Sequence, residues 1–402
     1  MVFTPEQLEK YARVMVWGLE RSRSGAFAPG DVVMVRTDVE ALPLAETVQA
    51  ELLARGLHPV VRMLSTPGLD KNLFAKGNRM QITFVCPGDR ELQETACGSM
   101  ALLAPSSLTH LKDVPPDRIA ARTLALKFLR DIAEQREAKG LFGWTLCLFP
   151  TVALAEAAGM GLAEYTAQII RAAYLDAEDP VGEWERVFMQ AGKVKTWLNG
   201  LDTDHYRVRS ARVDLKVPRG HDRQWIGVSG HNIPSFELFL SPDWRGVEGV
   251  YYADQPSYRS GNLVSGVELR FEKGEVTFIR AEQGEEFVRR QLDMDAGARR
   301  LGEFSLTDTR FSRIDRFMAH TLFDENYGGE HGNCHVAVGA SYADTYTGNP
   351  AELNGARKEA LGFNESALHW DLVNTEPKTV TAVDSKGRET VVYENGRFVC
   401  GI

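Results

Sequence analysis

The sequence is poor in cysteine and lacks the C-x-x-C motif. Five cysteines occur among 402 residues, and the intervals between them are wide. An odd number of cysteines at such spacing fits neither a disulfide framework nor a cysteine-rich zinc module. We therefore expect a reducing, cytoplasmic environment.

Several signatures of nucleotide-binding and catalytic sites are also missing. No G-x-G-x-x-G follows an expected strand, and there is no Walker A loop. The H-E-x-x-H helix of many zinc proteases and the G-x-S-x-G nucleophile elbow are absent as well. These absences argue against dinucleotide binding, NTP binding and two common hydrolase sites. The first half is therefore expected to be a scaffold, a lid or a dimerisation element.

Positive charge is scarcer than negative charge. Lysine and arginine total 46 against 55 aspartates and glutamates, so the formal net charge is −9. An acidic protein repels phosphate backbones and anionic lipid surfaces, which disfavours nucleic acid and membranes as partners. The N-terminus has neither a basic nor an apolar signal region, and Pro150 and Glu156 interrupt the most apolar stretch, 141–165. We expect no membrane span.

The first half alternates expected strands with expected helices. Thr4, Pro5 and Gln7 form a helix-start signal, with a capping box and proline at the first helical position. Apolar runs predict strands at 31–36, 59–63, 82–86 and 141–148, and helices at 41–54, 162–173 and 180–198. This alternation predicts an α/β domain over residues 1–203, built on a doubly wound parallel sheet.

The second half is predicted to be rich in β-structure. Strands are expected at 208–217 and 232–240, with hairpins at 267–280 and 379–399 and one helix around 310–322. We place the domain boundary near residue 203. Residues 204–402 are predicted to form an α+β, β-rich, metal-binding catalytic domain.

Two glutamates occupy positions where a strand should be packing. Because side chains alternate along a strand, Glu237 and Phe239 should share one face, opposite Leu238 and Leu240. A buried carboxylate needs a partner, and both an arginine and a metal ion are possible partners. Glu303 poses the same choice, because two arginines precede it at 299 and 300.

Two histidines lie on further expected strands. His335 alternates with Val336 and Val338, and either a core position or a metal-ligand role fits it. His369 and Asp371 are two residues apart and should project from the same face, as metal ligands or as a histidine oriented by a carboxylate. Together with the glutamates and Tyr342, these residues would suit two divalent ions that share a bridging carboxylate. The nitrogen and oxygen donors fit zinc, cobalt or manganese alike.

The order of these residues resembles the M29 family of metallo-aminopeptidases. The resemblance rests on the motifs NIPSFELFLSP, LGEFSL, LFDEN, NCHVAVG and HWD, and on the opening TPEQLEKYA. It implies a two-domain homodimer that removes N-terminal residues from short peptides with two divalent metal ions. It also implies a ligand set of Glu237, Glu303, Glu325, His335, His369 and Asp371, with Tyr342 as a ligand or a hydrogen-bond donor.

This chain departs from the family pattern in two places. Phe236 and Leu240 replace smaller residues beside Glu237, and we expect them to narrow the substrate pocket. The connection 327–332 is longer than in the family, so that either Glu325 or Glu330 is the ligand before His335.

The expected mechanism assigns Glu303 as the bridging carboxylate, a glutamate as general base, and Tyr342 as a stabiliser of the oxyanion. Two rival functions follow from the same residues. His335, His369 and Asp371 alone match the two-histidine, one-carboxylate site of mononuclear Fe(II) oxygenases, here a ring-cleaving dioxygenase. A non-catalytic metal-binding protein is the other rival.

Overall fold

The computed structural model describes residues 2–259 and 261–401. The chain divides into two compact units. The first comprises Met1–Trp184 together with Ser229–Ile233, and the second comprises Glu185–Val228 together with Pro234–Ile402. The chain thus passes to the second unit, returns briefly to the first, and leaves again. The division at residue 203 and the catalytic role given to the second domain stay predictions.

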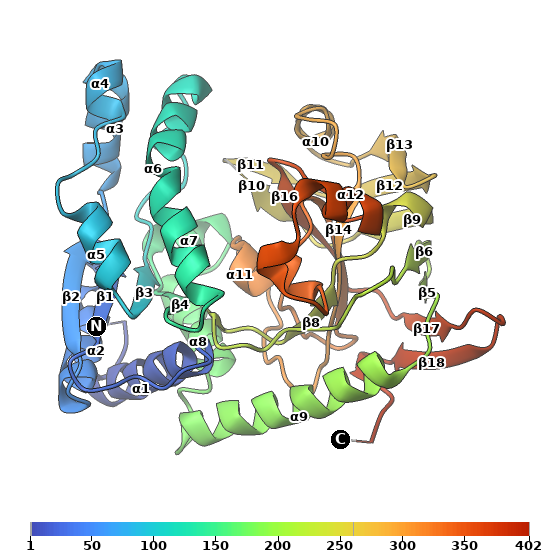
Figure 1. Cartoon of the computed structure of the whole chain (residues 1–402), viewed down its shortest axis with the longest axis horizontal. Helices are drawn as coiled ribbons and strands as arrows, with labels where there is room; N and C mark the ends of the chain where they lie inside the picture. The colour runs from blue at the N-terminus through green and yellow to red at the C-terminus, as the bar shows by residue number, and fades with distance from the viewer. Residues whose placement is uncertain (1, 260, 402) are drawn as a thin grey trace. The chain divides into compact units, whose positions relative to one another are not determined.

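A parallel sheet forms the centre of the first unit (Figure 1). Its strand order is β2-β1-β3-β4-β7, and every neighbouring pair is parallel. The central strands are mostly buried, as expected when helices cover a parallel sheet. The strands are β1 (Val32–Thr37), β2 (His58–Met63), β3 (Gly98–Leu103), β4 (Gly143–Leu148) and β7 (Asn232–Ile233). The predicted N-terminal parallel sheet with helices is confirmed.

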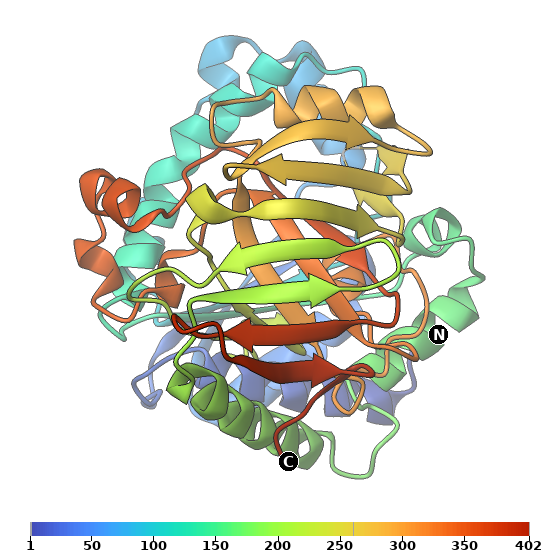
Figure 2. The same cartoon turned by 90° about the vertical axis from the view of Figure 1, so that its right-hand side faces the viewer.

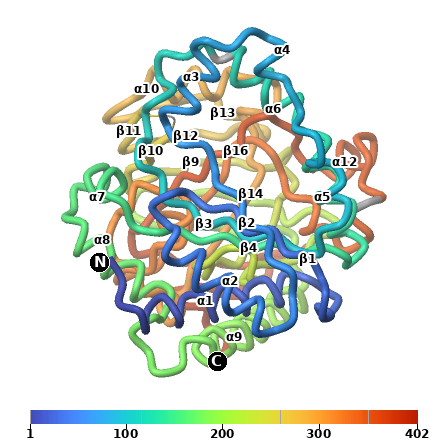
Figure 3. The backbone as a smooth tube through the Cα atoms, turned by 90° about the vertical axis from the view of Figure 1, so that its left-hand side faces the viewer, coloured from blue at the N-terminus to red at the C-terminus, as the bar shows by residue number. Residues whose placement is uncertain are grey.

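The first helix of this unit begins at a residue that caps it. At the start of α1, the Thr4 hydroxyl accepts the Gln7 N–H at 3.2 Å, and the Gln7 amide oxygen accepts the Thr4 N–H at 2.9 Å. This is the expected capping box. Helices α1 and α2 pack side by side (Figure 3). The helices are α1 (Pro5–Arg21), α2 (Leu42–Ala54), α3 (Pro67–Lys76), α4 (Arg79–Ile82), α5 (Asp89–Thr95), α6 (Pro116–Glu137), α7 (Val152–Ala157), α8 (Leu162–Ala172) and α9 (Pro180–Gly200), which continues into the second unit.

The prediction of a strand at 82–86 is wrong. The chain there ends the short helix α4, which Asn78 and Gln81 start with a second capping box. The third strand of the sheet is instead β3, which the sequence analysis missed. The capping residues therefore outweighed the apolar character of the segment that follows them.

Two large antiparallel sheets form most of the second unit. The larger has eight strands in the order β13-β12-β9-β6-β5-β17-β18-β19, and Figure 2 shows it face on. Its strands are β5 (His205–Arg209), β6 (Asp214–Pro218), β9 (Glu248–Ala253), β12 (Val267–Glu272), β13 (Glu275–Arg280), β17 (Thr379–Val383), β18 (Glu389–Glu394) and β19 (Arg397–Phe398). The hairpins predicted at 267–280 and 379–399 are confirmed, and so is a β-rich C-terminal half.

The smaller sheet has the order β16-β15-β14-β8 and lies behind the larger one in Figure 2. Apolar side chains fill the space between the two sheets. For example, the ring of Tyr206 from the larger sheet packs against that of Phe304 from the smaller one, with the ring centroids 5.7 Å apart. The Tyr251 hydroxyl donates to the backbone oxygens of Cys334 and Leu372 at 2.9 and 2.7 Å. One face of the smaller sheet therefore packs into the core. Its strands are β8 (Glu237–Leu240), β14 (Leu301–Thr307), β15 (Asn333–Gly339) and β16 (His369–Asn374).

The remaining elements of the second unit are short. They are the hairpin β10 (Ser257–Arg259) and β11 (Asn262–Val264), and the helices α10 (Glu285–Leu292), α11 (Thr321–Asp324) and α12 (Gly355–Leu361). Within the described residues, no helix combines the length and the apolar character that a bilayer crossing requires.

Three further expectations for this half need correction. The strand expected at 208–217 is the hairpin β5–β6, closed by the Ser210 N–H donating to the Val213 oxygen. The strand expected at 232–240 is divided by Pro234 into β7 and β8, which belong to different sheets. Proline has no N–H to donate to a ladder, which accounts for the interruption.

The helix expected around 310–322 is reduced to the single turn α11. The buried carboxylate of Asp324 accepts the N–H groups of Met318 and His320 at 2.6 and 2.9 Å. Ala319, between them, has a φ of 52°. Side-chain hydrogen bonds to the backbone compete here with the helical ladder and hold the segment in an irregular path.

Candidate metal centre

The face of the smaller sheet that is turned away from the core carries the predicted ligands. In the antiparallel register, Glu237 is opposite Thr307, His335 is opposite Ser305, and His369 is opposite Gly339. Glu303 and Asp371 are both opposite Ala337. Directly paired residues project from the same face, so one face displays Glu237, Glu303, His335, His369 and Asp371.

Small side chains leave room for these ligands. Ala337 lies between Glu303 and Asp371 in the register, and its methyl group leaves space for both carboxylates above it. The register of β14 shifts between Leu301 and Glu303, which is a bulge at Gly302. A side chain at Gly302 would collide with the backbone oxygens of residues 339 and 340. The bulge therefore needs glycine, and it sets the direction in which Glu303 points.

The ligand atoms converge in two overlapping groups. The first is Glu237, Glu303 and His335, the second is Glu303, His369 and Asp371, and within each group the ligand atoms lie within 4.8 Å of one another. His335 Nε2 is 3.1 Å from Glu303 Oε1 and 3.2 Å from Glu237 Oε2. His369 Nε2 is 3.6 Å from Glu303 Oε2 and 3.4 Å from Asp371 Oδ1. Glu303 thus offers one oxygen to each group.

Burial leaves some polar atoms of the site without hydrogen bonds. His335 Nδ1 is buried without a hydrogen-bond partner, and Glu237 Oε2, although 3.2 Å from His335 Nε2, makes no hydrogen bond of good geometry. His369 is held differently, because its Nδ1 is 2.9 Å from the Ala340 oxygen. An unsatisfied buried carboxylate oxygen is costly, and a divalent cation would satisfy it. The donor set therefore fits a metal ion.

The carboxylates perturb one another's protonation. Burial raises the pKa of Glu303 to about 7, against the opposing effect of His335. Burial also raises the pKa of Glu325 well above its usual range, and the charges of Glu237 and Asp371 add to this. Burial acts in the same direction on Asp371, but His369 outweighs it and holds the Asp371 pKa down to about 2. Several buried acids in one place are the electrostatic environment of a cation site.

The two candidate glutamates of the longer connection differ sharply. Glu325 follows α11 and is 9% exposed, whereas the side chain of Glu330 is 87% exposed and lies 3.9 Å from His331. Glu325 and Asp371 line a small cavity of about 10 Å³ whose wall also includes Thr321 and Asp324. The structure therefore brings Glu325, but not Glu330, to the cluster, although Glu325 belongs to neither ligand group.

Tyr342 lies beside the cluster, on the loop that follows β15. Its ring centroid is 4.6 Å from that of His369 and 5.8 Å from that of Phe239. Its N–H donates to the hydroxyl of Ser241 at 2.8 Å. Although 43% of the residue is exposed, the partial burial of its hydroxyl and the nearby carboxylates, Glu303 first among them, raise the pKa of this hydroxyl above the ordinary value. The hydroxyl therefore stays protonated and is available as a donor.

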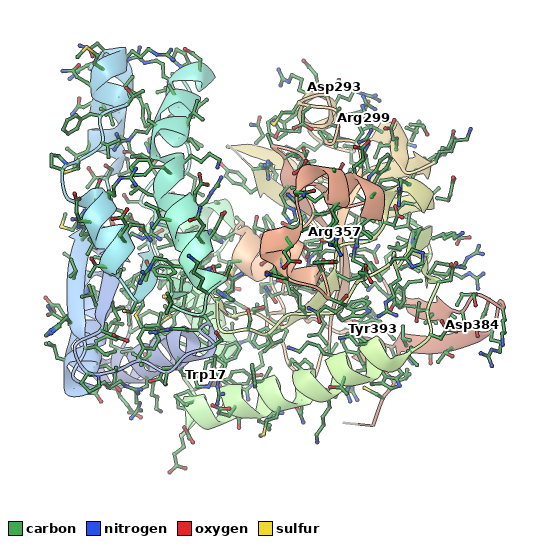
Figure 4. All side chains as sticks on the ribbon, in the orientation of Figure 1. Trp17, Asp293, Arg299, Arg357, Asp384 and Tyr393 are labelled. Carbon is green, nitrogen blue, oxygen red and sulfur yellow. The ribbon has the colours of Figure 1, made fainter. Side chains whose placement is uncertain are left out.

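The arginines that precede Glu303 have other partners. Arg299 lies 2.6 Å from Asp293, a pair labelled in Figure 4, and Arg300 lies 2.9 Å from Glu275. An arginine ion pair thus does not explain the burial of Glu303. Leu240 is fully buried on the core face, so the expectation that it narrows the substrate pocket is wrong.

Sequence reasoning missed two side chains that contact the ligand residues. Arg259, on β10, donates to the backbone oxygen of His369 at 2.9 Å. Asn326 is fully buried and donates to the carboxylate of Glu325 at 3.4 Å. The only signal for Asn326 was its place next to Glu325, and nothing marked Arg259.

The chain is similar to several known proteins. A family model described as thermophilic metalloprotease (M29) matches residues 4–398. Aminopeptidase T of Thermus thermophilus is 31% identical over 307 residues, covering 72% of this chain and 73% of that protein. Aminopeptidase PepS of Streptococcus thermophilus is 25% identical over 419 residues, covering 98% of each. The solved structure of wild-type AmpT from Thermus thermophilus superposes with a TM-score of 0.81 at 25% identity, covering 98% of this chain and 99% of that one.

Proposed function

Because the chain belongs to the thermophilic metalloprotease family M29 and is a metallo-aminopeptidase, we propose that it removes N-terminal residues from short peptides at a dinuclear metal centre on the smaller sheet. The supporting observation is the position of Glu303, whose two oxygens face two different ligand groups. A carboxylate shared in this way is what a pair of bridged divalent ions requires. We assign Glu237 and His335 to one ion, His369 and Asp371 to the other, and Glu303 to both.

The proposed metals are zinc, cobalt or manganese. The donors are imidazole and carboxylate groups, and the neighbouring Cys334 is a buried thiol on the core face of β15. A soft thiolate ligand is therefore absent from the proposed set. When bound, such ions polarise the scissile carbonyl and lower the pKa of an attacking water.

Proton transfer is assigned to Glu325. Its carboxyl lies outside both ligand groups, and burial raises its pKa above the ordinary value, which makes the carboxylate a stronger proton acceptor. The cavity that it lines with Asp371 is about the size of one water molecule. In this proposal Glu325 takes a proton from the water and gives it to the leaving amine. The alternative ligand role for Glu325 stays a prediction.

Substrate contacts are assigned to the edge of the site. The Tyr342 hydroxyl, which stays protonated, is proposed to donate a hydrogen bond to the oxyanion of the tetrahedral intermediate. The rings of Phe239 and Tyr342 form an apolar wall beside it. The ammonium group of the substrate would be attracted by the buried carboxylates, which accounts for exopeptidase action.

The test combines metal analysis with blocked and unblocked peptides. We expect close to two divalent ions per chain, release of N-terminal residues from unblocked peptides, and no release after N-terminal acetylation. Cleavage of acetylated peptides at the same rate, or full activity after chelation, would contradict the proposal. The homodimer, the cytoplasmic location and the doubly wound arrangement of the first domain stay predictions.

A further inference from the structure

We propose that Asn326 is a positioning residue, whose side-chain amide fixes Glu237 for metal binding and holds Glu325 beside the metal centre. This inference rests on the proposed metal centre and extends it to a residue outside the ligand set. The Asn326 side chain is fully buried, in the segment that follows α11. A buried amide needs partners for its oxygen and its nitrogen, and here both are used.

The amide oxygen holds the start of β8. It accepts the N–H groups of Phe236 at 2.5 Å and of Glu237 at 3.1 Å. Strand β8 is the edge of its sheet, and on its outer side the Phe239 N–H donates to the Ile226 oxygen at 3.0 Å. The N–H groups of residues two apart in a strand point to the same side, so that of Glu237 also points outward. Asn326 therefore replaces a missing strand partner at the residue that carries the first carboxylate.

The amide nitrogen holds the segment that carries Glu325. It donates to the Leu322 oxygen at 3.0 Å and to Glu325 Oε1 at 3.4 Å. The backbone around Glu325 is fixed independently, because Asn333 on β15 donates to the Glu325 oxygen at 3.1 Å. The hydrogen bond from Asn326 connects the side chain of Glu325 to β8, the strand that bears Glu237. One amide thus sets the separation of two carboxylates that approach from different segments.

The residue type follows from these roles. The position needs two acceptor contacts and two donor contacts, which an asparagine amide supplies and an aspartate does not. An aspartate at this position would face Glu325 with a like charge. Alanine would leave two buried N–H groups unpaired and would remove the contact to Glu325.

The experiment measures Co²⁺ binding by the full-length protein, through affinity and through the visible absorption spectrum of the bound ion. Substitution of residues that orient metal ligands typically weakens metal binding by about 10–100-fold, and we expect a loss in this range for Asn326→Ala. We also expect a changed Co²⁺ spectrum, because the geometry around the ion should change. The matched control is Asn374→Ala, another fully buried asparagine, whose amide donates to the Tyr252 oxygen from the core side of β16. The control should lose stability but keep the wild-type affinity and spectrum.

A second variant covers the case in which Asn326→Ala does not fold. Asn326→Asp has the same shape, but it loses the donor to the Leu322 oxygen and to Glu325 and faces both with an acceptor oxygen. This repulsion should displace the oxygen that holds the N–H of Glu237, so we expect weaker Co²⁺ binding and a changed spectrum here too. Wild-type affinity and spectrum in a folded Asn326 variant would overturn the inference while leaving the metal centre intact. An equal loss of affinity in Asn374→Ala would overturn it as well, because the effect would then be a general loss of stability. Absence of Co²⁺ binding by the wild-type protein would overturn the metal centre itself.

Discussion

His335 Nε2 lies 3.1 Å from Glu303 Oε1, on the neighbouring strand of the smaller sheet. Both side chains are buried, and the paired strands β14 and β15 fix them in place. This pair forms the part of the cluster that is least accessible to solvent. The consequences of removing either partner should therefore be large.

Glu303→Gln should remove most of the activity. The amide keeps the size of the side chain but loses the charge that both ligand groups share. We expect kcat/KM to fall by more than about 100-fold, the upper end for residues that only orient ligands. Metal per chain, measured by elemental analysis, should fall at the same time. Glu275→Gln, at an exposed partner of Arg300, is the control and should keep both values. Full activity in Glu303→Gln would refute the shared-carboxylate assignment.

Tyr342→Phe should lower the rate without lowering metal content. The ring contact to His369 is kept, and only the proposed oxyanion donor is lost. Loss of one such donor typically costs about 100–1,000-fold in kcat. Steady-state kinetics with an unblocked peptide, together with elemental analysis of the bound metal, test this prediction. An unchanged kcat would show that the hydroxyl does not stabilise the oxyanion.

Glu325→Gln and Glu330→Gln should behave differently. Glu325 is buried beside the cluster, whereas Glu330 is exposed to solvent. We expect a decrease in kcat of about 100-fold or more for Glu325→Gln, in line with the loss of a general base. Glu330→Gln should retain wild-type kinetics. The reverse result would move the catalytic role to the longer loop.

The metal-free protein should lose stability as the pH rises from 6.5 to 9. Burial lowers the pKa of His369, but Asp371 and Glu303 outweigh it and raise the pKa to about 9, above the unfolded value of 6.5. The folded state then binds the proton more tightly, so its stability contribution is full below pH 6.5 and is lost as the pH rises through 9. The shift corresponds to about 3 kcal/mol.

Urea unfolding in the presence of a chelator, at pH 6.5 and pH 9, measures this change. His369→Gln should reduce the difference between the two pH values. With metal present the trend should weaken or reverse, because metal binding needs a neutral imidazole. A pH-independent unfolding free energy in the chelated wild type would contradict the coupling.

Gly302→Ala should disturb the bulge that aims Glu303. An added methyl group would collide with backbone oxygens of residues 339 and 340, which cannot move away easily. We expect a loss of about 1–3 kcal/mol in unfolding free energy, the usual cost of overpacking. Metal affinity should fall in parallel. Gly192→Ala, inside α9 where a methyl group would meet open space, is the matched control and should keep the metal affinity without loss of stability.

The alternation of side chains along strands predicted much of the candidate site. It placed Glu237 and Phe239 opposite the core residues Leu238 and Leu240, and the register agrees. It also placed His369 and Asp371 on one face. These inferences succeed because a strand with one buried face imposes a strict period of two on its sequence.

Other features depend on contacts that a local pattern does not contain. The irregular segment before α11 is held by Asp324, whose two acceptor contacts replace a helix. Asn326 gains its role only from the approach of β8, which is distant in sequence. In both cases a buried polar side chain overrides local helix or strand preference, and its partners are known only once the chain has folded.

The division of residues 232–240 into β7 and β8 limits how the chain can be divided into fragments. Strand β7 pairs with β4 in the first unit, and the chain reaches β8, with Glu237, after only residues 234–236. No single cut therefore separates the two units, because a fragment that begins near residue 204 would keep β7 but lose its pairing strand. Recombinant expression of the second half alone would leave that strand unpaired immediately upstream of a candidate metal ligand. Exchange of the first half between relatives would likewise have to replace two stretches of sequence, not one.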